Sequence, residues 1–203
     1  MLGMTNCGKT TFTRRLVSEL RRLYPLANTY VCDSKGAGDF DMWGGHTDSE
    51  RAPALPRGDG RMQVWTPPSD NLDEYDRWFH AILKRREPAI VIIDELSSIG
   101  GRRGVDYPVG YAKLLKQGRG LHISLITLSQ EYAGMPRQVA GQTTHLVRFR
   151  LLNRFDRKAA DALLGRPFEE DESEPREEHG FFYSRLDRQP RRYIEYAGHQ
   201  QFF

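Results

Sequence analysis

The stretch Gly3-Met4-Thr5-Asn6-Cys7-Gly8-Lys9-Thr10 reads G-x-x-x-x-G-K-T, the pattern of a loop that wraps the phosphates of a nucleotide. Its glycines let the backbone curl so that successive N–H groups point at the phosphates. A helix beginning near Lys9 would add the positive end of its dipole. We expect Lys9 to reach the β- and γ-phosphates and the Thr10 hydroxyl to ligate Mg²⁺. The candidate nucleotide-binding residues are Gly3, Met4, Thr5, Asn6, Cys7, Gly8, Lys9, Thr10 and Thr11.

The context of this loop is complete on one side only. Lys9 to Leu23 reads as an amphipathic helix, with leucines and Phe12 on one face and arginines on the other. A loop of this kind normally follows a buried strand, but only Met1 and Leu2 precede it. We therefore expect either a start that lies upstream or a first strand that begins almost at the loop.

Strands and helices alternate along the rest of the chain, which predicts an α/β fold with a mainly parallel sheet flanked by helices. Aspartate 156 offers an N-cap to the last helix, and Gly165 closes it. Two further strands, at 180–184 and 191–196, read as a C-terminal hairpin. The expected strands lie at Asn28–Cys32, Arg61–Thr66, Ala89–Ile93, Leu121–Leu128 and His145–Leu151, and the expected helices at Lys9–Leu23, from Leu72 after a cap at Ser69 to Asn71, at Val109–Gln117 and at Asp156–Leu164.

The composition along the chain suggests three regions. Residues 1–165 would form one phosphate-binding domain, in which residues 36–60, rich in Gly, Pro and Asp, form a surface insertion. Residues 166–179 are too acidic to pack and are expected to be a disordered linker. Residues 180–203 would hold the hairpin and a tail.

Polar side chains follow two of the apolar strands. Asp94 and Glu95 come directly after Ala89–Ile93, and Gln130 follows Leu121–Leu128. Parallel α/β sheets carry their chemistry at the carboxyl ends of the strands. Asp94 suits a metal ligand, and Glu95 suits a base that orients the attacking water. The plain alternative is a solvated acidic cap and a surface glutamine, which we disfavour for the acidic pair and leave open for Gln130.

Size and charge set broad limits. The chain has 203 residues and a net charge of +3, too small by itself to indicate strong nucleic-acid binding. Cys7 and Cys32 show no metal or redox spacing. No apolar run approaches the ~20 residues of a membrane span, so we expect no membrane segment and a location in the cytoplasm, or in the host cytoplasm or virion if the protein is viral.

Several motifs together resemble the FtsK–HerA superfamily of ring-forming ATPases, which includes DNA translocases and viral DNA-packaging ATPases. The resemblance covers roughly residues 1–165. It rests on the order G-M-T-N-C-G-K-T, V-C-D-S-K-G, R-M-Q-V-W, A-I-V-I-I-D-E and G-R-G-L-H-I-S-L-I-T-L-S-Q. The last of these motifs is the most discriminating, because many phosphate-binding loop proteins share only the first.

The resemblance implies a RecA/ASCE-like P-loop fold, with ATP and Mg²⁺ as cofactors and a ring, expected to be a hexamer, that moves double-stranded DNA through phosphate contacts. It makes Lys9 and Thr10 the Walker A residues, Asp94 and Glu95 the Walker B pair, and Gln130 the sensor. Asp33-Ser34-Lys35-Gly36 matches the family's Asp-x-Lys-Gly motif. Two further residue sets are implied with a plain alternative beside each: Arg119 as an arginine finger or a helix-terminal arginine, and Arg102 and Arg103 as DNA contacts in a pore or part of a surface loop.

Two other functions remain open at this point. A nucleotide or small-molecule kinase shares the first motif but has no need of Glu95 beside Asp94. A slow ATP-dependent switch or assembly protein could carry the first motif together with Asp94 and Glu95. The sequence also leaves open the oligomer size, the strandedness of the DNA, the direction of movement and the process served.

Overall fold

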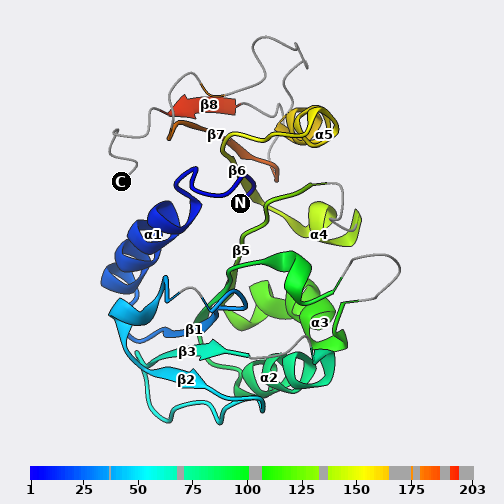
Figure 1. The fold of residues 1–203 in the computed structure, drawn as a ribbon. Helices are drawn as coiled ribbons and strands as arrows, with labels where there is room; N and C mark the ends of the chain where they lie inside the picture. Colours follow the sequence, from blue (N-terminus) through cyan, green and yellow to red (C-terminus); the bar gives the residue numbers. More distant parts are fainter. Residues whose placement is uncertain are drawn as a thin grey trace. The chain divides into compact units, whose positions relative to one another are not determined.

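The computed structural model describes residues 1–36, 38–67, 71–100, 107–132, 137–164, 175, 179–187 and 193–196 (Figure 1). Contacts between residues divide the chain into two compact units. The first unit combines Met1–Phe12 with Ser129–Phe203, and the second is Thr13–Leu128. Helix α1 (Lys9–Leu23) begins in the first unit and continues into the second.

The second unit is built on a five-stranded parallel sheet in the order β2-β3-β1-β4-β5. Its two central strands, β1 and β4, are buried at every residue, because neighbouring strands pair with both edges and helices cover both faces. The strands are β1 (Asn28–Cys32), β2 (His46–Asp48), β3 (Met62–Thr66), β4 (Ala89–Ile93) and β5 (Ile123–Thr127).

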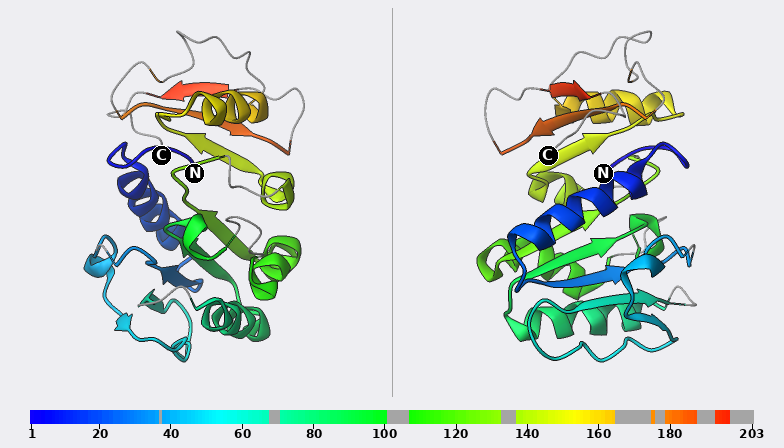
Figure 2. Two further views of the ribbon diagram at one scale, coloured as in Figure 1. Left: turned by 45° about the vertical axis from the view of Figure 1, so that its right-hand side comes forward. Right: turned by 90° about the vertical axis from the view of Figure 1, so that its left-hand side faces the viewer.

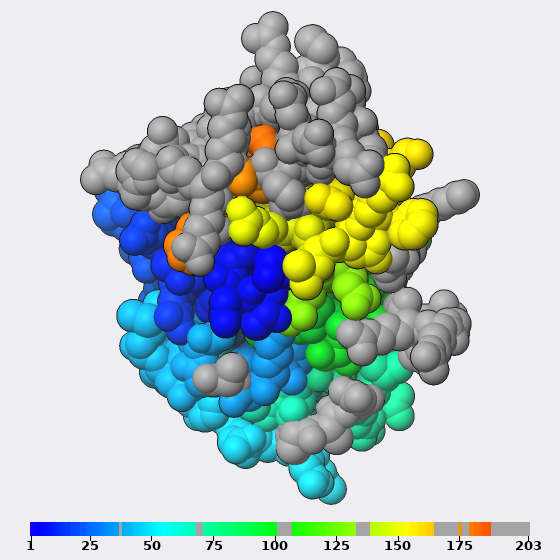
Figure 3. Space-filling view, turned by 45° about the horizontal axis from the view of Figure 1, so that its top comes forward, coloured from blue at the N-terminus to red at the C-terminus, as the bar shows by residue number. Residues whose placement is uncertain are grey.

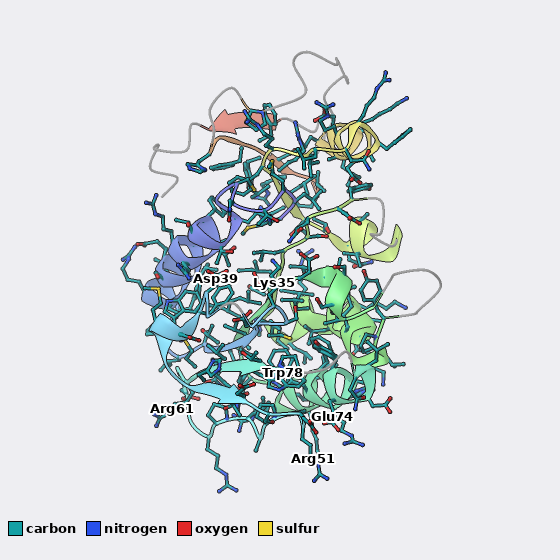
Figure 4. All side chains as sticks on the ribbon, viewed as in Figure 1. Lys35, Asp39, Arg51, Arg61, Glu74 and Trp78 are labelled. Carbon is teal, nitrogen blue, oxygen red and sulfur yellow. The ribbon has the colours of Figure 1, made fainter. Side chains whose placement is uncertain are left out.

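Helices α2 (Leu72–Arg85) and α3 (Val109–Gln117) lie side by side on one face of this sheet, and the α1 residues from Thr13 onward lie on the other (Figure 2). The connections β3–α2–β4 and β4–α3–β5 run in the same direction across the sheet, so right-handed crossovers place both helices on one face. Asn71 caps α2 by accepting a hydrogen bond from the Asp73 amide. Trp78 lies between α2 and the sheet, with its ring centroid 5.5 Å from that of Trp65 on β3 (Figure 4).

Residues 36–60 contain more structure than their composition indicates. A short 3₁₀ helix, η1 (Asp41–Trp43), follows the fully buried Phe40, and β2 pairs in parallel with β3 at the edge of the sheet. Arg14 of α1 donates to the carbonyl oxygen of Asp39. These contacts fasten the segment to α1 and to the sheet edge.

The first unit holds a three-stranded antiparallel sheet, β6-β7-β8. The strands are β6 (His145–Arg148), β7 (Phe181–Arg185) and β8 (Tyr193–Tyr196). The C-terminal hairpin predicted from the sequence is therefore present. Its first strand also pairs with β6, and α5 (Arg154–Leu164) packs on β7.

The strand expected before the phosphate loop is reduced to Leu2. This residue forms parallel bridges on both sides, to Ser129 and to Arg148. Its amide donates to the Val147 carbonyl and its own carbonyl accepts from the Phe149 amide, at 2.9 and 2.8 Å. Leu2 is fully buried in the apolar core of this unit, so it holds the start of the loop in register with two neighbouring chain segments.

The start of α5 differs from the prediction. The helix begins at Arg154, and the Asn153 side chain accepts the Phe155 amide, as a capping residue does. Asp156 lies in the first turn and instead accepts the amide of Tyr132 at 2.9 Å. The predicted cap at Asp156 is therefore wrong, because a tertiary contact takes that carboxylate.

Three short elements complete the description: η2 (Leu96–Ser98), η3 (Gly118–Leu121) and α4 (Arg137–Gln142). The α/β fold with a mainly parallel sheet, flanking helices and a C-terminal hairpin is confirmed. The predicted closure at Gly165 and most of the acidic linker at 166–179 lie outside the described residues. Within the part of the chain that is described, none of the helices has the length and apolar character needed to cross a membrane.

Candidate nucleotide-binding and hydrolysis site

The phosphate-loop residues Gly3–Thr10 lie between the Leu2 bridges and the first turn of α1, in the first unit. The Lys9 side chain is only 5% exposed, and its ammonium donates to the carbonyl oxygens of Gly3 and Met4, the latter at 2.6 Å. The Cys7 sulfur lies 3.8 Å from the same nitrogen. The loop thus closes around its own lysine.

The two glycines of the motif are required by different features of the backbone. A Cβ atom at Gly3 would lie 2.7 Å from both the Cys7 sulfur and the Phe149 Cβ, closer than packed atoms approach. Gly8 has a φ angle of 99°, in the region that side chains disfavour. Glycine is therefore favoured at both of the positions where the motif has it.

The amino end of α1 offers a site for an anion. The first turn of α1 contains no acidic residue, so nothing on the helix competes with a bound phosphate for the unpaired N–H groups. Thr10 is partly buried and Thr11 is exposed. The N-terminal segment, dark blue, reaches the surface on the face shown in Figure 3.

Gln130 belongs to this same unit. The residue before it, Ser129, accepts the amide of Gly3 at 3.1 Å and donates its own amide to the Met1 carbonyl at 2.9 Å. Gln130 is exposed. The residue next to Gln130 is therefore hydrogen-bonded to the start of the phosphate loop.

Asp94 and Glu95 lie in the second unit, directly after β4. Asp94 is fully buried, and burial raises the pKa of its carboxyl above the ordinary value, an effect that the nearby Lys35 ammonium opposes. Among the described residues the Lys35 ammonium, 3.3 Å from one carboxylate oxygen, is the charged partner of Asp94. A buried carboxylate in this state is suited to a cation.

Glu95 is held by its own turn. One carboxylate oxygen accepts the Ser97 hydroxyl at 2.9 Å and the Ser97 amide at 3.4 Å, which caps η2. Tyr107 lies near this carboxylate: burial, with a smaller contribution from the Glu95 charge, raises the pKa of its phenol to about 12. The tyrosine therefore stays neutral near Glu95 at physiological pH.

Lys35 contacts the acidic pair, a contact that the sequence did not reveal. Its ammonium lies 3.3 Å from one oxygen of Asp94 and 3.6 Å from one oxygen of Glu95. The side chain comes from the segment that follows β1 (Figure 4). A signal existed in the Asp33-Ser34-Lys35-Gly36 motif after a strand, but the spacing alone does not indicate which carboxylates the lysine meets.

Three predicted residues remain, of which the structure describes only Arg119. Arg119 is in η3, exposed, and its side chain forms no hydrogen bond or ion pair with a described residue. Arg102 and Arg103 lie outside the described residues.

The side chains present, a carboxylate and a hydroxyl, are of the type that binds Mg²⁺. This ion prefers oxygen ligands and is usually bound through one or two carboxylates together with substrate phosphates. Asp94 offers a buried carboxylate in the second unit, and Thr10, the hydroxyl that the loop motif provides, belongs to the first unit.

Comparison with solved structures identifies the fold. The chain matches the genome packaging NTPase B204 from Sulfolobus turreted icosahedral virus 2 in complex with ATP-gammaS, with a TM-score of 0.70 and 12% identity over 95% of this chain and 93% of that one. B204, the DNA-packaging ATPase from Sulfolobus turreted icosahedral virus, gives a TM-score of 0.72 with the same identity and coverage. This chain therefore shares the α/β fold of these packaging NTPases.

Part of a secretion ATPase has a similar fold. The cytoplasmic domain of the Thermomonospora curvata type VII secretion ATPase EccC matches 97% of this chain with a TM-score of 0.65 and 16% identity, and the match spans 25% of the EccC chain. Neither a comparison with protein-family models nor one with curated proteins gives a match. At these identities the structural likeness establishes the fold, and the activity has to be argued from the residues.

Proposed function

We propose that this chain is an ATP-hydrolysing motor that translocates or packages DNA as a ring, with a hexamer as the expected assembly. The observation that carries the proposal is the pairing of two features in one chain. A phosphate loop closes around Lys9, and a buried Asp94 with an adjacent Glu95 ends the central strand β4. A fold shared with DNA-packaging ATPases supports it.

In this proposal the phosphate loop binds the triphosphate. The Lys9 ammonium exchanges the Gly3 and Met4 carbonyls for phosphate oxygens, and the α1 N-terminus adds its N–H groups. Thr10 and Asp94 would hold Mg²⁺, which when bound neutralises charge on the β- and γ-phosphate oxygens.

Hydrolysis in the proposal depends on three further side chains. Glu95 orients the attacking water and accepts its proton, while Ser97 holds one oxygen of its carboxylate. Gln130 contacts the γ-phosphate or the water. Arg119, exposed and without a described partner, is the trans arginine supplied to the neighbouring subunit.

DNA would be held through its phosphates rather than its bases, with Arg102 and Arg103 as the proposed contacts. Such contacts weaken steeply as salt concentration rises. The proposed binding is therefore independent of sequence and sensitive to salt.

The test is ATP hydrolysis with and without long double-stranded DNA, for the wild type and Glu95→Gln. The proposal predicts turnover that DNA stimulates and that the substitution abolishes while ATP still binds. Hydrolysis indifferent to DNA would contradict a motor and favour a slow switch. Transfer of the γ-phosphate to a small acceptor, little affected by Glu95→Gln, would favour a kinase.

A further inference from the structure

Lys35 reaches the acidic pair because of the sheet order. Strand β1 lies beside β4 in parallel, with Cys32 opposite Ile93, so the residues that follow the two strands leave the sheet at the same edge. Lys35 follows β1 by three residues, and its ammonium meets Asp94 at 3.3 Å and Glu95 at 3.6 Å. One cation therefore serves two carboxylates from the next strand.

The contact of Lys35 with Asp94 and Glu95 matters because it places a positive charge beside two buried negative charges. The Asp94 side chain is 0% exposed and that of Glu95 is 9% exposed, whereas Lys35 is 29% exposed. Buried carboxylates are strongly unfavourable without a compensating cation. Among the described residues, the Lys35 ammonium is the compensating group that the structure places beside Asp94.

The same ammonium also restrains Glu95. Ser97 holds one oxygen of the Glu95 carboxylate, and Lys35 lies beside the other. Both oxygens are therefore engaged before any ligand arrives.

We propose that Lys35 is the resident counter-cation of Asp94 and Glu95 and competes with the divalent metal for Asp94, so that the nucleotide-free protein takes up little metal. This inference rests on the proposed function in treating Asp94 as the metal ligand. Metal then enters with the nucleotide, whose phosphates add the negative charge needed to hold a second cation beside Lys35. Displacement of the ammonium from Asp94 also loosens Glu95, which makes Lys35 a positioning residue for the water-activating carboxylate.

The test is Mn²⁺ binding in the absence of nucleotide, followed by electron paramagnetic resonance of the free ion. Lys35→Met removes the charge and keeps the aliphatic stem, and we expect it to bind Mn²⁺ about tenfold more tightly than the wild type. Lys35→Arg, which keeps a cation, should bind like the wild type. Lys116→Met is the matched control, because Lys116 is an exposed lysine of α3. Equal affinity in Lys35→Met and the wild type would overturn the proposal.

Two further variants keep the test decisive. Should Lys35→Met fail to fold, Lys35→Gln removes the charge while its amide can still donate to the carboxylates, and the same gain is expected. The double variant Lys35→Gln with Asp94→Asn should lose the gain, and a gain that persists would place the metal elsewhere and overturn the proposal. These titrations use no ATP, so a protein that never hydrolyses ATP could still pass them, and the two proposals fail separately.

Discussion

Lys9 and Lys35 are held in different ways. Lys9, in the phosphate loop, donates to the neutral carbonyls of Gly3 and Met4. Lys35, after β1, faces the full charges of Asp94 and Glu95. A carbonyl dipole is readily exchanged for a phosphate oxygen, whereas an ammonium between carboxylates leaves only when another cation replaces it. Under the two proposals, Lys9 receives an anion and Lys35 is displaced by a metal.

The largest effect should come from a residue that belongs to neither lysine group. Arg119→Ala should lower turnover by about 10³- to 10⁵-fold while ATP affinity changes little, because a trans arginine acts on the transition state. Steady-state hydrolysis and nucleotide binding measure the two quantities. Mixing Arg119→Ala with Glu95→Gln subunits should restore part of the activity, since some interfaces then hold both wild-type groups. No recovery on mixing would place Arg119 outside a shared site.

Glu95→Gln tests the carboxylate side of the comparison. Loss of the base should lower turnover by about 10²- to 10⁴-fold, with ATP still bound. Glu87→Gln serves as a matched control, since Glu87 is a glutamate near the start of β4 that pairs with Arg85. Equal loss in both variants would show that the effect is structural.

Substitutions of Lys9 and Lys35 should have different effects on ATP affinity when metal is removed. With a chelator present, Lys9→Met should weaken ATP binding by about 10- to 100-fold, the range for hydrogen bonds to charged groups. Lys35→Met should leave metal-free ATP affinity nearly unchanged, because its proposed partners are carboxylates and the metal. Fluorescent nucleotide titration distinguishes the two. Similar losses in both variants would show that Lys35, like Lys9, contributes to metal-free ATP binding.

The smallest expected effect is that of Asp94→Asn on the free energy of unfolding. This substitution should stabilise the protein, whereas the other substitutions lower an activity or an affinity. Burial raises the pKa of this carboxyl, so the folded state favours its neutral form over the charged one. The resulting penalty is present above the folded-state pKa and disappears as pH falls below the ordinary value of 3.8. At neutral pH we therefore expect the substitution to stabilise the nucleotide-free protein by about 1 kcal/mol, as neutralising a strained site often does.

Denaturant unfolding at neutral and acidic pH checks this expectation. The stabilisation should shrink as the wild-type carboxyl becomes protonated. A substitution that destabilises the protein at neutral pH would mean that the Lys35 contact outweighs the burial of Asp94.

Elements with a strong local pattern could be predicted from the sequence. Ala89–Ile93 is a continuous apolar run, and Lys9–Leu23 and Val109–Gln117 carry helical periodicity or boundaries, so their limits match the structure. Strand β2 was not predicted because His46–Asp48 is short, polar and half exposed, and only its pairing with β3 makes it a strand. The cap of α5 was missed because Asn153 and Asp156 are both good capping residues, and the contact with Tyr132 decides between them.

In the candidate site, too, some features follow from local sequence and others from tertiary contacts. Its motif residues, Lys9 and the Asp94–Glu95 pair, are recognisable because their chemistry requires fixed neighbours. The part played by Lys35 is a tertiary effect: it depends on β1 lying next to β4, and no local pattern specifies strand order. The engagement of Glu95 by Ser97 is likewise visible only once the turn has formed.

The most direct test of a DNA motor is ATP-driven displacement of a triplex-forming oligonucleotide from long double-stranded DNA. The account predicts displacement by the wild type with ATP, none with a non-hydrolysable analogue, and none by Glu95→Gln. Triplex displacement that fails in a wild-type protein shown to hydrolyse ATP would contradict the motor, and the phosphate loop and acidic pair would then belong to an ATPase with another task.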